Sequence, residues 1–281
     1  MRWWYPLVLV RSIFVTFFYL PVFTVVGSVV VIALVKLRLG GENHVIKWWA
    51  QSLCWLYGVQ VVVRRWFSST QAPILVKDYQ NQSLEDLVSR RVKDGKKGIP
   101  SIPKGRGGIV LFNHASFFDI FSLSTVLPAL RYGAKKELFS IPFFGRAMRA
   151  TGVVPIDRDN RDRAISALSS AKGFLDLGGW LALAPEGGRL GGDDRLAAFK
   201  SGPFHLILGT QCLVYPVLIR GAAMVWPKGF WLPGLSNWRY TVYLDFLPPL
   251  SPVGLTPKDK EVLKDFTWHY MRSWQKQLNT N

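Results

Sequence analysis

The residues whose types and spacing could do chemistry lie in one short stretch, Asn113-His114-x-x-x-x-Asp119. The apolar residues Gly108–Phe112 before it predict a buried strand, and the residues from Ser116 onward predict a helix. Side chains in the first turn of a helix lean back toward the preceding residues, so Asp119 is expected to face the ring of His114. A histidine oriented by a carboxylate is a general base with a fixed tautomer. The stretch therefore predicts proton abstraction.

The same residues also allow a purely structural interpretation. Ser116-x-x-Asp119 in front of an apolar run resembles a capping box, in which the carboxylate accepts hydrogen bonds from backbone N–H groups. On that interpretation His114 is an ordinary loop histidine. The stretch alone leaves both interpretations open, and polar residues further along the chain favour the catalytic one.

Polar residues also follow three other predicted strands, Gly152–Ile156, Trp180–Ala184 and Cys212–Ile219. Ligands of open α/β sheets bind in the crevice beyond the carboxyl ends of the strands, so these residues are expected to converge with His114. A histidine, carboxylates and guanidinium groups in one crevice suit an anionic substrate and a base. The residues at these strand ends are Asp157, Arg158, Glu186, Arg189 and Arg220.

The polar residues named above are positioned by residues 108–250, where expected strands alternate with expected helices. This alternation predicts an α/β fold with a mainly parallel sheet flanked by helices. A further strand is expected at 239–247. The chain is expected to close with a helix from Thr256 to Leu278, which has a capping threonine and a proline at its first position. The helices between the strands are expected at Phe117–Leu127, Arg161–Leu177 and Gly202–Gly209.

The N-terminal section is apolar enough to enter a membrane. Residues 12–35 form a run of 24 residues without a charge, long enough to cross a hydrocarbon core. Pro21 and Gly27 are able to kink this run, so one tilted span and a re-entrant helical pair are both open. Residues 48–63 are rich in aromatic side chains and predict an interfacial helix that passes into a strand. Residues 1–63 are therefore predicted to be the membrane-embedded element.

The chain carries 35 lysine and arginine residues against 18 acidic residues, a net charge of +17. Such an excess predicts an acidic partner surface, either nucleic acid or anionic phospholipid. The apolar N-terminus favours lipid. No nucleic-acid partner is expected, because the basic run at 90–106 is not interleaved with aromatic residues.

Residues 64–107, which contain this basic run, are predicted to be a connector that is either solvated or laid on anionic headgroups. Residues 108–281 are predicted to be the globular domain. The two cysteines, Cys54 and Cys212, show neither metal-ligand spacing nor a disulfide framework. No metal site is therefore expected.

Five sequence blocks, in order along the chain, resemble the glycerolipid acyltransferase family over roughly residues 48–250. The branch that this chain resembles most is that of the bacterial 1-acylglycerol-3-phosphate (lysophosphatidic acid) acyltransferases. The blocks are Asn113-His114-x-x-x-x-Asp119, Lys135-Lys136-Glu137-Leu138-x-x-Ile141-Pro142-Phe143-Phe144-Gly145, Gly152-Val153-Val154-Pro155-Ile156-Asp157-Arg158, Pro185-Glu186-Gly187-Gly188-Arg189 and Tyr215-Pro216-Val217.

The resemblance implies a membrane-bound enzyme of phospholipid biosynthesis. It would move an acyl chain from an acyl carrier protein or coenzyme A thioester to the sn-2 hydroxyl of lysophosphatidic acid, giving phosphatidic acid, with no further cofactor. His114 would be the base and Asp119 would hold its ring. The resemblance further implies that Lys135, Arg158 and Arg189 bind the phosphate, and that Glu186 and Gly187 belong to the acceptor site. A salt bridge from Glu186 to Arg189 is the competing interpretation.

Two departures from the family pattern leave the acceptor headgroup open. Gly188 stands where threonine or serine is common, and the connector 64–107 is longer than usual. The acceptor could therefore be another lysophospholipid or an aminolipid. A catalytically silent membrane-binding scaffold is the alternative from a different class. The Lys and Arg residues that follow the apolar run predict an inner-membrane protein whose catalytic domain faces the cytoplasm.

Overall fold

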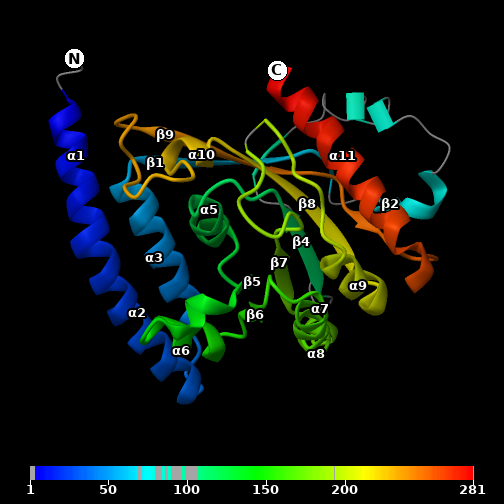
Figure 1. The fold of residues 1–281 in the computed structure, drawn as a ribbon, viewed down its shortest axis with the longest axis horizontal. Helices are drawn as coiled ribbons and strands as arrows, with labels where there is room; N and C mark the ends of the chain where they lie inside the picture. Colours follow the sequence, from blue (N-terminus) through cyan, green and yellow to red (C-terminus); the bar gives the residue numbers. More distant parts are fainter. Residues whose placement is uncertain are drawn as a thin grey trace.

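The computed structural model describes residues 4–68, 71–79, 84–85, 88–89, 96–98, 107–192 and 194–280. Its centre is a ten-stranded sheet (Figure 1). The strands are β1 (Val59–Arg65), β2 (Ile74–Leu75), β3 (Lys96–Lys97), β4 (Gly108–Phe112), β5 (Arg131–Lys135), β6 (Val154–Ile156), β7 (Trp180–Leu183), β8 (Leu213–Arg220), β9 (Tyr240–Phe246) and β10 (Leu250–Ser251). They run in the order β3-β1-β9-β8-β4-β7-β5-β6, with β2 and β10 beside this path.

The helices surround this sheet. The N-terminal ones are α1 (Tyr5–Phe14), the π-helical turn η1 (Val15–Tyr19), α2 (Leu20–Lys36) and α3 (Glu42–Leu56). The others are α5 (Phe118–Val126), α6 (Phe144–Ala150), α7 (Arg161–Ser169), α8 (Lys172–Asp176), α9 (Gly202–Thr210), α10 (Ala222–Val225) and α11 (Lys260–Thr280). Short 3₁₀ turns are η2 (Val76–Tyr79), η3 (Lys136–Ser140) and η4 (Pro257–Asp259).

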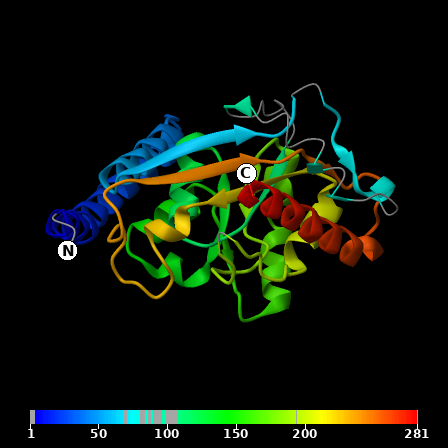
Figure 2. The same cartoon turned by 90° about the horizontal axis from the view of Figure 1, so that it is seen from above.

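Parallel pairing dominates the sheet, which confirms the predicted fold class. Strand β4 is parallel to both β7 and β8, β5 is parallel to β7 and β6, and β1 is parallel to β9. The antiparallel pairs on this path are β8 with β9 and β1 with β3. Seen from above in Figure 2, β1 and β9 run side by side. The carboxyl ends of β4, β5, β6, β7 and β8 therefore meet at one edge, where a ligand crevice is expected.

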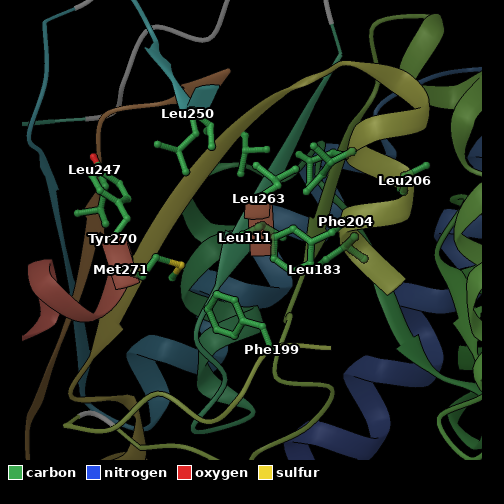
Figure 3. Close-up of a cluster of buried hydrophobic side chains, with 14 of the residues drawn as sticks. Leu111, Leu183, Phe199, Phe204, Leu206, Leu247, Leu250, Leu263, Tyr270 and Met271 are labelled. Carbon is green, nitrogen blue, oxygen red and sulfur yellow. The ribbon is translucent and has the colours of Figure 1, made fainter. Parts of the chain in front are cut away.

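Both faces of the sheet are covered, which explains why β4 is apolar at every position. Successive side chains of a strand point to opposite faces. Ile109 and Leu111 enter one core, with side chains of α7, α8, α9 and α11 (Figure 3). Val110 and Phe112 enter the opposite core, with side chains of α3 and α5. The strand that carries His114 at its end is thus fixed from both sides.

Two expected elements differ in detail, and one strand was not expected. The helix expected at Arg161–Leu177 is two helices, α7 and α8, because the two serines before the break and Gly173 after it weaken a continuous helix. The strand expected from Gly152 begins at Val154, since Gly152 has a φ of +78° and forms a turn. Strand β5 was not expected, because Arg131–Lys135 lacks an alternating apolar pattern.

The N-terminal helices form a hairpin along one side of the sheet (Figure 1). Residues 5–36 are one continuous helical stretch, which among the described residues meets the length and hydropathy requirements of a membrane span. Positive φ angles at Arg38, Gly40 and Gly41 then reverse the chain, and α3 returns along α2. The helical-pair geometry is therefore present in the structure.

The sheet takes strands from all three regions that the sequence distinguishes. Strand β1, from the N-terminal region, pairs over its whole length with β9 of the globular domain. Strands β2 and β3, from the predicted connector, pair with β10 and β1. Most of the basic run at 90–106 lies outside the described residues.

Candidate active site

The ring of His114 is held by the carboxylate of Asp119. His114 lies two residues beyond β4, and Asp119 lies in the first turn of α5. The His114 Nδ1 and Asp119 Oδ2 atoms are 2.8 Å apart, and both residues are buried. A hydrogen bond at Nδ1 places the ring proton there, which leaves Nε2 as the atom able to accept a proton.

The same carboxylate oxygen also caps the loop. Asp119 Oδ2 accepts hydrogen bonds from the backbone N–H groups of Ala115 and Ser116, each at 2.8 Å. The same carboxylate therefore makes the backbone hydrogen bonds of the structural interpretation and the contact with the His114 ring that the catalytic interpretation requires. Because these bonds fix Asp119, it holds the His114 ring without needing to reorient.

Asn113 attaches the histidine loop to the neighbouring strand. Its amide donates to the carbonyl of Ile219 at 2.9 Å, and its side-chain oxygen accepts from the N–H of Ile219 at 2.7 Å. Ile219 lies in β8, which is parallel to β4. Two hydrogen bonds to one residue fix both the distance and the direction of the loop, so the start of the motif is locked to the sheet.

Glu186 supports His114 from behind. Its Oε1 accepts from the His114 backbone N–H at 2.9 Å, and its Oε2 accepts from the Ala197 N–H at 2.8 Å. The side chain is fully buried, and burial raises the pKa of Glu186, while the two backbone hydrogen bonds oppose that rise. Its carboxylate makes no ion pair with Arg189 within the described part of the chain.

Four basic residues line a cavity with His114; Arg131 pairs with Glu42 at 3.9 Å, and the other three are the expected phosphate ligands. Lys135 stands at the carboxyl end of β5, Arg158 follows β6, and Arg189 follows β7. The Arg189 guanidinium carbon lies 4.4 Å from the centre of the Phe117 ring, and its Nη1 is buried with no hydrogen-bond partner among the described residues. Buried donors normally have partners, so a donor left open in a cavity points to an anionic ligand.

The rest of the cavity is apolar. It has a volume of about 590 Å³ and extends from His114 into the space enclosed by α2, α3, α5 and α6. Typical wall residues are Phe23, Val31, Trp49, Phe121, Phe144 and Met148. A cationic, histidine-bearing end joined to an apolar cavity suits an amphipathic substrate with an anionic head and a hydrocarbon chain.

Two residues expected in the crevice lie elsewhere, which corrects the sequence interpretation. Asp157 forms ion pairs with Lys136 at 2.9 Å and with Arg163 at 3.6 Å. The Nε atom of Arg220 contacts buried Asp245 at 3.1 Å, and its Nη1 contacts the Leu278 carbonyl at 2.7 Å. Both side chains are used within the protein because an oppositely charged or polar partner lies on a neighbouring element.

Glu186 and Gly187 also lie outside the cavity wall, whereas Lys135, Arg158 and Arg189 line it. Sequence reasoning missed several residues of the site. Trp226 forms part of the wall and contacts the Phe117 ring at 5.0 Å between ring centres. It comes from a loop more than 100 residues after His114, and no local pattern marks it. Within the described residues there is no cluster of three or more His, Cys, Asp or Glu side chains that could hold a metal.

Comparisons with known proteins agree with this geometry. Residues 95–220 match the family model described as Acyltransferase. Similar proteins include the chloroplastic 1-acyl-sn-glycerol-3-phosphate acyltransferase LPAT1 of Arabidopsis thaliana, which is 31% identical over 47% of this chain and 37% of its own length. The 1-acyl-sn-glycerol-3-phosphate acyltransferase of Helicobacter pylori is 27% identical over 58% of this chain and 69% of its own. The mouse 1-acyl-sn-glycerol-3-phosphate acyltransferase alpha is 30% identical over 66% of this chain and 64% of its own.

The fold is shared with a solved structure. The crystal structure of the 1-acyl-sn-glycerophosphate acyltransferase PlsC from Thermotoga maritima superposes with a TM-score of 0.69 at 22% identity. The superposition covers 98% of this chain and 96% of that one. At this identity the likeness establishes the fold.

Proposed function

We propose that the protein transfers an acyl chain from a thioester to the sn-2 hydroxyl of lysophosphatidic acid, giving phosphatidic acid. The match of residues 95–220 to the acyltransferase family model and the names of the similar proteins support this proposal. The observation that carries the proposal is the junction of three features: the His114–Asp119 pair, the Arg189 Nη1 that has no hydrogen-bond partner among the described residues, and the apolar cavity.

His114 acts as the general base. Its Nε2 takes the proton of the acceptor hydroxyl while that oxygen attacks the thioester carbonyl. The resulting tetrahedral intermediate collapses with cleavage of the C–S bond, and the proton on His114 passes to the leaving thiolate. Asp119, at 2.8 Å, stabilises the imidazolium formed in between. No acyl-enzyme is needed, because the acceptor alcohol takes the place of an enzyme nucleophile.

The cations hold the acceptor phosphate. Arg158 and Arg189 offer forked N–H donors that match phosphate oxygens, and Lys135 adds a point charge. Burial lowers the pKa of Arg158, which is the expected direction for a guanidinium removed from water. An anion bound there restores a favourable environment for the charge. The acyl chain occupies the apolar cavity, since about 590 Å³ accommodates a hydrocarbon chain.

The N-terminal hairpin gives this chemistry a location. Exposed apolar side chains cover the continuous helical stretch 5–36, among them Phe14, Phe18, Val22, Val26 and Val30. Because the cavity wall includes residues of α2 and α3, a lipid in the bilayer is delivered directly to His114. We therefore expect the protein to be membrane-bound, and the Lys36 and Arg38 charges after the apolar run favour a catalytic domain on the cytoplasmic side. Coenzyme A and acyl carrier protein thioesters, both anionic donors, are available on that side and are attracted by the +17 chain.

Another headgroup remains the second candidate, favoured by Gly188. A side-chain carbon added there would lie 3.4 Å from Nη1 of Arg158, so the glycine leaves space beside a phosphate-binding group. The test is acyl transfer by purified protein in mixed micelles, with acyl-coenzyme A or acyl carrier protein donors and a panel of lysophospholipids. Phosphatidic acid formed by the wild type and lost in His114→Ala is expected. Transfer only to a lysophospholipid with another headgroup would change the assigned acceptor. No transfer with any combination of donor and acceptor would favour a catalytically silent scaffold.

A further inference from the structure

The loop between α10 and β9, residues 226–239, exposes large aromatic side chains that the catalytic site does not use. Phe230 is 60% exposed, Trp231 is 70% exposed and Trp238 is 45% exposed. The loop is also basic, with Lys228 and Arg239 exposed and no acidic residue. An exposed aromatic cluster of this kind marks an interaction surface, because exposed Trp and Phe are otherwise costly in water.

The loop is fixed to the first apolar helix. Arg11 of α1 donates to the Trp238 carbonyl at 2.7 Å and to the carbonyls of Gly234 and Asn237, each at 3.3 Å. The Arg11 guanidinium also lies 4.8 Å from the centre of the Trp238 ring. The Ser12 hydroxyl donates to the carbonyl of Pro233. The loop carbonyls thus surround a charge that would otherwise be isolated on an apolar helix.

The exposed aromatic side chains continue the apolar face of that helix. The Trp231 ring lies 6.0 Å from the ring of Phe17, between ring centres. Phe14, Phe17 and Phe18 are each more than half exposed. Figures 1 and 2 both show the orange loop beside the blue N-terminal helix. One surface therefore joins the helix and the loop, although they are separated by more than 200 residues in the chain.

The base of the loop lies at the catalytic cavity. Trp226 lines the cavity together with His114, and its carbonyl accepts a hydrogen bond from the Ser116 hydroxyl at 3.2 Å. Its indole N–H donates to the Phe230 carbonyl at 2.7 Å, which ties the exposed tip to the cavity wall. A short path of hydrogen bonds therefore connects the tip of the loop with the mouth of the catalytic cavity.

We propose that loop 226–239 is a second membrane-contacting element, which inserts Phe230 and Trp231 at the headgroup–acyl boundary of an anionic bilayer beside α1. Trp is preferred at this depth, and Lys228 and Arg239 are attracted to anionic headgroups. The loop sets the height of the cavity mouth relative to the lipid surface. The inference rests on the membrane location given under the proposed function.

Depth measurements test the loop directly. The chain has 12 tryptophans, so a site-specific fluorophore is needed. It is attached at Trp231→Cys in a Cys212→Ser background, where the remaining Cys54 is buried. Matched labels stand at Val22→Cys on α2 and at Lys276→Cys on α11, both exposed positions. The full-length protein is placed in phosphatidylethanolamine–phosphatidylglycerol vesicles that contain lipids brominated near the headgroup. Quenching at 231 and 22 but not at 276 is the expected result.

The other quenching patterns refute the proposal in distinguishable ways. A label at 231 that behaves like the label at 276, while the one at 22 is quenched, would show that the loop faces water. If the label at 231 instead responds to an added acidic carrier protein, the loop is a donor-docking surface. If none is quenched, the membrane location fails and the loop proposal fails with it.

Kinetics supply a second readout. The double variant Phe230→Ser/Trp231→Ser is expected to raise the apparent KM for a vesicle-borne acceptor about tenfold. The reason is the loss of two aromatic side chains that insert partly into the lipid. The same variant should leave turnover of a water-soluble short-chain acceptor within about twofold, since neither residue lines the cavity. Equal losses with both acceptors would mean that the loop supports the site structurally, which contradicts the proposal.

Discussion

Glu186→Gln tests whether this buried carboxylate positions His114 or binds the acceptor. In the structure its two oxygens accept from the backbone N–H groups of His114 and Ala197, at 2.9 and 2.8 Å. Glutamine keeps the shape but offers only one acceptor, so its NH₂ group must face one of these two donors. One charge-assisted hydrogen bond is lost and a buried N–H is left without a partner, which costs about 2 kcal/mol.

If His114 is then less well positioned, and the activation free energy rises by this amount of about 2 kcal/mol, kcat falls about 30-fold. Each 1.36 kcal/mol corresponds to a tenfold change in rate. The KM for the acceptor should change little, because Glu186 does not line the cavity. The assay is steady-state acyl transfer in micelles at varied acceptor and donor, with thermal unfolding measured in parallel. Glu261→Gln on α11 is the matched control, as its carboxylate is exposed, and its kcat should stay within about twofold. An unchanged kcat with a raised acceptor KM would refute the positioning role and return Glu186 to the binding site.

Three further substitutions follow from the same geometry. Gly191→Ala should lower kcat about tenfold, because its Cβ would clash with Glu186 Oε2 and with the Arg195 backbone carbonyl and so displace Glu186. Gly192→Ala has nothing within 4 Å and should be neutral; equal kcat values would contradict this. Arg189→Ala should raise the KM for a phosphate-bearing acceptor at least about tenfold and that for the thioester far less, and equal effects would make Arg189 structural. Asp119→Asn should lower kcat by about 10²–10⁴-fold and leave the acceptor KM unchanged, because a neutral amide cannot stabilise the His114 imidazolium. Asp162→Asn, at an exposed position, is the control. Similar turnover in the two variants would contradict a catalytic role of the His114–Asp119 pair.

The part of the site that is local in sequence could be predicted from sequence. His114 and Asp119 are five residues apart, at a strand end and in the first helical turn, and those two elements alone bring the side chains together. Their catalytic roles remain predictions for the kinetic tests. Arg158 and Arg189 likewise follow strands of a parallel sheet, so the topology rule places them at one edge, whereas Lys135, at the end of the unexpected strand β5, was predicted only from the family resemblance.

Contacts between distant elements could not be predicted. Arg220 also follows a strand, but β9 brings the buried carboxylate of Asp245 beside it and removes it from the crevice. No sequence pattern predicted that the Glu186 carboxylate accepts from the backbone N–H of His114, a contact that the adjacency of β7 and β4 makes possible; its role at the acceptor site stays a prediction. The same limit applies to the cavity walls, because Phe23 and Trp226 meet there from opposite ends of the chain.

The most direct test of His114 as the base is the kcat of His114→Asn with lysophosphatidic acid and acyl-coenzyme A in mixed micelles. General-base catalysis predicts a loss of about 10²–10⁴-fold, with an unfolding temperature close to that of the wild type and unchanged binding of the thioester. Turnover within about tenfold of the wild type in a folded variant would contradict it and remove histidine from the mechanism.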